Sequence, residues 1–232
     1  MGVSPGDDVS GAPSHDDLAI TASARAAGEE FARLVSVNQN LRVECPWDAR
    51  QTHLSLVKHL IEETSEVVDA LEIGTPDDQR EELGDLLMQV VFHASIAADE
   101  GDYDISQVIR GITDKLIARH PYIYGDAEMP DDLDASWERR KKAAKHRESS
   151  LDGIAEALPT LARAAKVAQR VHDVGPDMGP AQDEDLSISE QEAGEKILSL
   201  VRRAQRVGVD ADQATRAALR RWEAEIRAAE QS

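Results

Sequence analysis

The chain has 232 residues, of which 41% are hydrophobic and 31% are charged, a mixture typical of a globular protein with one large domain or two small ones. Its 26 basic and 45 acidic side chains give a formal net charge of −19, so nucleic acid and anionic membrane surfaces are not expected as partners. No apolar run approaches the roughly 18 residues of a membrane span, and the single cysteine, Cys45, excludes an internal disulfide and favours a reducing, cytoplasmic location.

Residues 1–17 are rich in Gly, Ser, Pro and Asp without a periodic apolar pattern, which predicts a disordered tail. From residue 18 onward apolar side chains recur at helical spacing almost everywhere. Thr75 followed by Pro76 is typical of a helix start, and Gly74 just before them is typical of a helix end. Helices are expected over residues 23–42, 52–73, 75–101, 105–120, 132–149, 159–173, 189–207 and 210–230.

No segment has the pattern of a strand, so the sequence predicts an all-α protein. The two halves also resemble one another, because residues 31–48 align without gaps on residues 161–178, and residues 82–85 align on residues 192–195. Between these two matches the second half is shorter by about the length of the helix at 52–73. The matches indicate a worn internal duplication, with chance similarity between two Ala- and Arg-rich helices as the alternative.

Acidic residues are paired at helical spacing on two consecutive expected helices. Glu63 and Glu66 lie three residues apart on the first, and Glu82 and Asp85 lie three apart on the second, so each pair projects from one helix face. Because the turn between the helices is short, they are expected to pack as an antiparallel hairpin in which the two pairs face one another. The plainer alternative is that these acids are solvated surface charges.

Four carboxylates this close repel one another, and only a cation or protonation relieves the repulsion. Oxygen ligands without His or Cys select a hard ion, Mg²⁺ or alternatively Mn²⁺. Mg²⁺ also keeps coordination positions open for water and for substrate phosphates. The paired acids therefore predict a metal site that serves a phosphate-bearing substrate.

The motif Glu62-Glu63-x-x-Glu66 is followed after 15 residues by Glu82-x-x-Asp85. This matches the E-E-x-x-E…E-x-x-D pattern of the all-α nucleoside triphosphate pyrophosphohydrolases, and the chain resembles the MazG family in particular. Further segments that resemble this family lie at residues 45–52, 84–94 and 114–121.

The resemblance implies hydrolysis of an NTP or dNTP between the α and β phosphorus atoms, giving a nucleoside monophosphate and pyrophosphate. It implies that the four paired acids hold Mg²⁺ and that Glu62 orients or deprotonates water. It also implies a MazG-like four-helix catalytic domain over residues 18–149, followed by a degenerate second repeat over residues 150–232. In that repeat the acidic helix is missing, and Glu195 replaces the aspartate of the second motif.

Basic side chains are expected to complete the triphosphate site. Lys115 and Arg119 lie four residues apart on one helix face, and Asp114 beside them suits a ribose hydroxyl or a metal-bound water. Lys58, one turn before the first acidic motif, is a weaker candidate. Trp47 either stacks on a base or anchors the entry to a helix by packing.

MazG-like proteins form tight dimers, and the apolar stripe over residues 83–96 fits a subunit interface, so we expect a homodimer. The alternative function is a catalytically weak helical interaction or regulatory protein that retains the MazG scaffold. Loss of acids would mark that outcome, and the first half has lost none. A di-iron bundle is excluded because none of the seven histidines has a Glu three residues before it.

Overall fold

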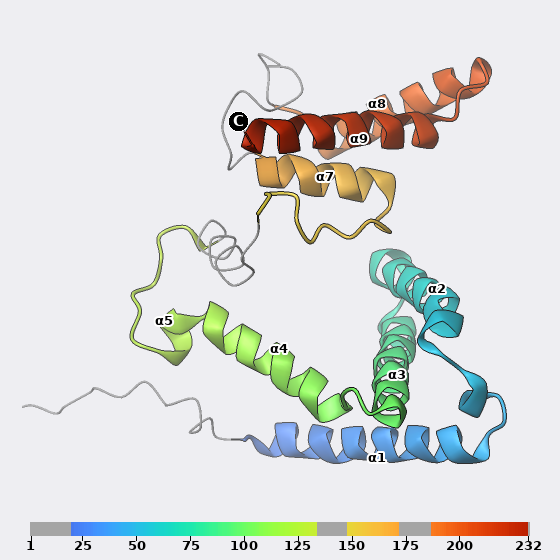
Figure 1. The fold of residues 1–232 in the computed structure, drawn as a ribbon, viewed down its shortest axis with the longest axis vertical. Coiled ribbons are helices and arrows are strands. Elements are labelled where there is room, and N and C mark those ends of the chain that lie inside the picture. Colours follow the sequence, from blue (N-terminus) through green and yellow to red (C-terminus); the bar gives the residue numbers. More distant parts are fainter. Residues whose placement is uncertain (1–19, 134–147, 172–186, 232) are drawn as a thin grey trace, which may run out of the picture. The chain divides into compact units, whose positions relative to one another are not determined.

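The computed structural model describes residues 20–133, 148–171 and 187–231 (Figure 1). Over these ranges the chain forms helices and no strand, which confirms the all-α class. The chain divides into two compact units, Met1–Trp137 and Glu138–Ser232. The tail expected at 1–17 and most of the helix expected at 132–149 lie outside the described residues.

Helix α1 spans Ala22–Glu44 and begins at Thr21, whose hydroxyl accepts a hydrogen bond from a backbone N–H of the first turn. A single 3-10 turn, η1 (Asp48–Arg50), follows it, and the sequence did not predict this turn. Arg42 ties the turn to the rest of the unit. Its guanidinium donates to two carbonyl oxygens in and after η1, at 2.6 and 3.2 Å, and pairs with the Asp99 carboxylate at 2.7 Å.

Helices α2 (His53–Ile73) and α3 (Pro76–Glu100) form the expected hairpin, and a capping box begins each of them. Gly74 connects the two helices and lies close to the backbone of Ala70. A Cβ at this position would lie 2.7 Å from the Ala70 carbonyl oxygen, so only glycine fits the turn without a shift.

The core of the first unit lies where α1 and α2 pack against α3. Leu56, Phe92 and Ile96 form a buried apolar cluster. Beside it the Ser95 hydroxyl donates a hydrogen bond of 2.7 Å to the buried Asn38 side chain, which satisfies two polar groups between α1 and α3.

The apolar stripe over residues 83–96 divides between core and surface. Its C-terminal half, including Val91 and Phe92, is buried within the unit. Leu83, Leu87 and Val90 remain 40–49% exposed. The structure therefore leaves only the N-terminal half of the stripe available to a partner, since the other half already packs against the same chain.

Helix α4 spans Ile105–Arg119, begins with a capping box at Asp104, and contains no buried residue. A short helix, α5 (Pro121–Tyr124), follows it between the helices expected at 105–120 and 132–149, because proline suits the first position of a helix. An open, mainly apolar groove lies between α1 and α4.

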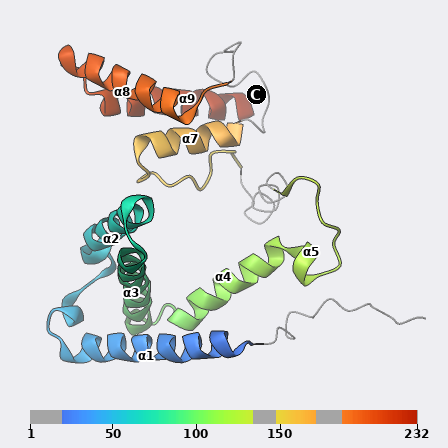
Figure 2. The same cartoon turned by 180° about the vertical axis from the view of Figure 1, so that it is seen from behind.

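The second unit contains α7 (Thr160–Val171), α8 (Glu190–Arg206) and α9 (Ala211–Glu230), close to the expected helices. Figures 1 and 2 both show α7 and α9 side by side. The unit's buried cluster is formed by Leu151, Ile154, Val167, Val171, Leu219 and Ile226. None of the helices in the described ranges combines the length and the hydropathy that crossing a membrane requires.

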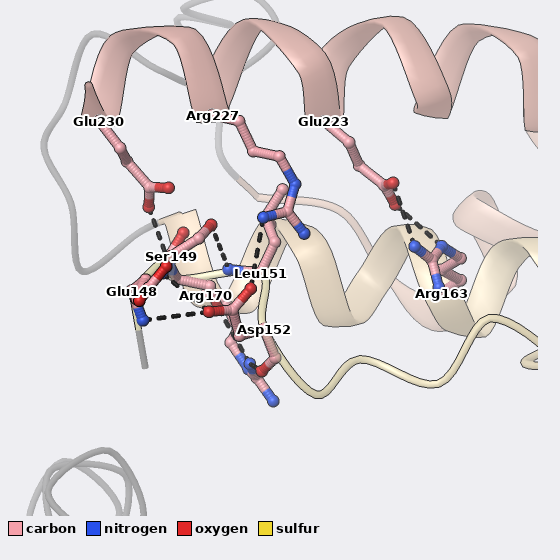
Figure 3. Close-up of polar contacts among 10 residues, drawn as sticks. Glu148, Ser149, Leu151, Asp152, Arg163, Arg170, Glu223, Arg227 and Glu230 are labelled. Atoms are coloured by element: carbon pink, nitrogen blue, oxygen red, sulfur yellow. Dashed lines mark hydrogen bonds and ion pairs between the residues drawn. The ribbon is translucent and has the colours of Figure 1, made fainter. Parts of the chain in front are cut away.

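Polar contacts hold the turn that precedes α7 and tie α7 to α9 in this second unit (Figure 3). The Asp152 carboxylate accepts hydrogen bonds from the backbone N–H groups of Glu148 and Ser149, both at 3.0 Å, so these residues form a turn and not the end of the expected helix. Arg163 of α7 and Glu223 of α9 point toward one another and make a two-pronged ion pair at 2.9 and 3.1 Å.

Candidate metal and substrate site

Three acidic side chains from neighbouring helices converge in the first unit. Glu63 and Glu66 come from α2 and Glu82 comes from α3, and a carboxylate oxygen of each lies within 4.8 Å of the other two. The hairpin fixed by the capping boxes brings these positions together, because the two helices run side by side from a short turn. Glu63 and Glu82 are half-buried and Glu66 is exposed, so the cluster opens to solvent.

Asp85, the fourth residue expected at the metal site, lies outside this group of three but acts on it electrostatically. Burial is the largest cause that raises the pKa of Glu63, and the charge of Asp85 comes next. The pKa of Glu82 is also raised, first by burial and then by the charges of Glu66 and Asp85. The four acids therefore form one electrostatically coupled set, which we call the acid cluster.

The donor set of the acid cluster suits a hard divalent cation. Among the described residues it contains the only group of three or more metal-ligating side chains, and all of its donors are carboxylate oxygens. The pKa values of Glu63 and Glu82 are raised by burial first and by neighbouring negative charge second, and a bound cation would relieve the repulsion between these charges.

Glu62 is exposed and lies beside the acid cluster on α2. One of its carboxylate oxygens is 3.4 Å from Nδ1 of His59, one turn earlier on the same helix. Sequence reasoning missed His59, although its spacing of three residues from Glu62 places the two side chains on one helix face.

Gln89 of α3 was also missed. It is buried, and its Nε2 donates a hydrogen bond of 3.4 Å to Oε1 of Glu63 across the hairpin. The signal was present in the sequence, because Gln89 lies one helical turn after Asp85 and therefore on the same face of α3.

Trp47 is 48% exposed and makes T-shaped contacts with two rings of the first unit. The centroid of its ring lies 6.1 Å from that of His59 and 6.4 Å from that of Phe92. These contacts place Trp47 between the core and the helix that carries Glu62.

The basic candidates lie on two different helices. Lys58 is exposed on α2, and Lys115 and Arg119 belong to the last turns of α4. Figure 1 shows α4 running away from the α2–α3 pair toward α5. Asp114 lines the groove between α1 and α4.

Residues 51–124 match the family model described as the MazG nucleotide pyrophosphohydrolase domain, a stretch that contains the whole acid cluster. The chain is 41% identical over 208 residues to a 26.1 kDa protein of Streptomyces cacaoi, an alignment covering 88% of this chain and 84% of that one. It is 36% identical over 229 residues to a nucleoside triphosphate pyrophosphohydrolase of Escherichia coli, covering 87% of each chain.

A third relative is the nucleoside triphosphate pyrophosphohydrolase/pyrophosphatase MazG of Thermotoga maritima, 35% identical over 217 residues, which cover 85% of this chain and 84% of that one. Identity at this level over most of both chains extends well beyond the acidic motifs. The chain therefore belongs to the MazG family.

Proposed function

We propose that this protein is a Mg²⁺-dependent nucleoside triphosphate pyrophosphohydrolase that cleaves the α–β bond of an NTP or dNTP. The products are a nucleoside monophosphate and pyrophosphate. The observation that carries the proposal is the convergence of Glu63, Glu66 and Glu82 on one edge of a helix hairpin. Membership of a family whose Escherichia coli and Thermotoga maritima members are named for this activity supports it.

In this proposal Glu63, Glu66, Glu82 and Asp85 hold Mg²⁺, with Mn²⁺ as a possible substitute. The cation would link an acidic protein to a polyanionic substrate, lower the pKa of a water and stabilise charge on the leaving pyrophosphate. Crowding of like charges in the metal-free state would favour binding of the cation.

Glu62 is proposed to orient or deprotonate the attacking water, since it lies next to Glu63 without belonging to the group of three. His59 would restrain its carboxylate through the 3.4 Å contact. A base must reach the proton that it removes, and Glu62 is close enough to the cluster for its charge to raise the pKa of Glu63.

Lys115, Arg119 and Asp114 on α4, and Lys58 on α2, are proposed to bind the phosphates and the ribose. The exposed half of the Trp47 ring is available to stack on a base. Basic side chains would neutralise the phosphate charge that the cation leaves uncompensated.

We also propose that residues 18–149 form the catalytic domain and residues 150–232 a degenerate second repeat. The alignment of residues 31–48 on residues 161–178 supports this, and α4 and α9 also both begin at an aspartate N-cap. Asp104 and Asp210 each accept a hydrogen bond of 2.9 Å from the backbone N–H of a glutamine three residues later. Glu195 of α8 would then stand where the first domain has Asp85.

A catalytically weak interaction or regulatory protein with the MazG scaffold is the second candidate. The exposed apolar side chains Leu83, Leu87 and Val90 on α3 favour a protein partner, although a second copy of the chain fits them equally well. Measured turnover distinguishes the two functions, since the scaffold protein would bind without hydrolysing triphosphates.

The test is incubation of the purified chain with Mg²⁺ and a panel of standard and oxidised nucleoside triphosphates, with products identified by mass spectrometry. We expect nucleoside monophosphate and pyrophosphate. Glu63→Ala and Asp85→Ala should abolish turnover, and Glu72→Ala, an exposed α2 acid outside the cluster, should not. Release of orthophosphate would contradict cleavage at the α–β bond, and equal activity of Glu63→Ala and wild type would contradict the assigned site.

A further inference from the structure

Gln89 is a buried polar side chain beside the acid cluster, with 4% of its surface exposed. Its Nε2 donates to Oε1 of Glu63 at 3.4 Å, from one helix of the hairpin to the other. Its own Oε1 is buried and has no hydrogen-bond partner within the described part of the chain. The amide nitrogen of Gln89 therefore has a hydrogen-bond partner, whereas its amide oxygen has none among the described residues.

Charge explains the orientation of the amide. An ionised carboxylate only accepts hydrogen bonds, so the N–H end of Gln89 must face Glu63 and the carbonyl end must face away. An acceptor that is buried without a donor destabilises the fold, and most buried polar groups avoid this state. Because the N–H group of Gln89 is directed at Glu63, its amide oxygen faces away and stays unpaired.

We propose that Gln89 is a positioning residue, which holds the Glu63 carboxylate in the orientation that binds the divalent cation. This inference rests on the proposed metal site. Groups that hydrogen-bond to metal ligands orient them, and removing such a group commonly weakens metal affinity about 10- to 100-fold. The 3.4 Å separation is long for a hydrogen bond, so we expect the lower end of that range.

The experiment measures Mn²⁺ affinity of the full chain by calorimetry, without nucleotide. Gln89→Met keeps the length of the side chain but removes the donor, and it should weaken Mn²⁺ binding about 10-fold. Gln89→Asn keeps an amide but withdraws it from Glu63 by one methylene, and it should weaken binding similarly. The matched control is Gln79→Met, because Gln79 of α3 also donates to α2, at 3.3 Å, but to the backbone oxygen of Ala70. Its affinity should stay at the wild-type value.

A second measurement separates positioning from general loosening of the hairpin. In a Glu63→Ala background, Gln89→Met should cause no further loss of Mn²⁺ affinity, since the carboxylate on which it acts is gone. An equal loss in both backgrounds, or wild-type affinity of both Gln89 variants, would overturn the inference while leaving the metal site in place. A wild-type chain that binds no Mn²⁺ would instead refute the proposed site and this inference together.

Discussion

Glu63 shows how neighbours decide what a single side chain does. Burial and the charge of Asp85 raise its pKa, whereas the hydrogen bond from Gln89 lowers it. Asp85 and Gln89 both come from α3, and Glu63 comes from α2. The chemistry of this carboxylate therefore depends on the register of the two helices as much as on its own identity.

Replacing Glu82 with Gln is expected to change how stability depends on pH in the absence of metal. In the folded chain the pKa of Glu82 is raised above 4.5, first by burial and then by the charge of Glu66. Between pH 4.5 and the raised value the native state holds a proton on Glu82 that the unfolded chain has lost, so the contribution of Glu82 to stability falls as pH rises through this window. Glu82→Gln should lose less stability over the same window.

Urea denaturation in EDTA, from pH 4.5 to neutrality, measures this difference. Glu72→Gln serves as the control, because Glu72 is exposed on α2 and lies outside the acid cluster. Identical pH dependence of wild type and Glu82→Gln would show that the charges at this site do not influence folding.

At the scale of elements, the α2–α3 hairpin is the structure that positions the acid cluster. Its turn consists of Gly74 and Thr75, and the capping box at Thr75 starts α3 immediately. Short connections of this kind bring consecutive helices into contact with each other. The turn therefore controls which carboxylates meet.

Gly74→Ala is expected to destabilise the first unit by about 1–3 kcal/mol, because the added Cβ would meet the Ala70 carbonyl oxygen at 2.7 Å and the turn would have to move. Gly28→Ala in α1 is the matched control. Nothing lies within 4 Å of a Cβ there, so alanine should stabilise that helix by up to about 1 kcal/mol. Urea denaturation of both variants checks the opposite signs, and a Gly74→Ala chain as stable as wild type would contradict the steric argument.

In the molecule as a whole, the first unit leaves large apolar side chains exposed to solvent. Leu83, Leu87 and Val90 of α3 stay exposed, and α4 buries no residue at all. Exposed apolar faces of this extent favour a protein partner. We therefore propose that the chain forms a homodimer through this face.

The proposed homodimer predicts that Leu87→Glu yields a monomer in sedimentation velocity, since a charge placed on the exposed part of the α3 stripe would be costly to bury at an interface. Val43→Glu, on an α1 residue that is 78% exposed, should leave the dimer intact. A monomeric wild-type chain would contradict the homodimer, and a dimeric Leu87→Glu variant would place the interface elsewhere.

The sequence by itself determined the helices and the pairing of acids along them. Capping residues such as Thr75 and the spacing of Glu63 and Glu66 act over one or two helical turns, so local patterns were enough to predict them. The α5 turn was missed for the opposite reason, because one short turn has too little periodic pattern to stand out from a loop.

Only the tertiary structure decided what surrounds those acids and which apolar residues form the core. Gln89 reaches Glu63 across 26 residues of sequence, and Arg42 reaches Asp99 across 57. The same packing buries Phe92 and leaves Leu87 at the surface, although both belong to one apolar stripe. Contacts of this kind depend on how whole helices are placed against each other, and the pattern along one helix does not specify which residues of another helix it meets.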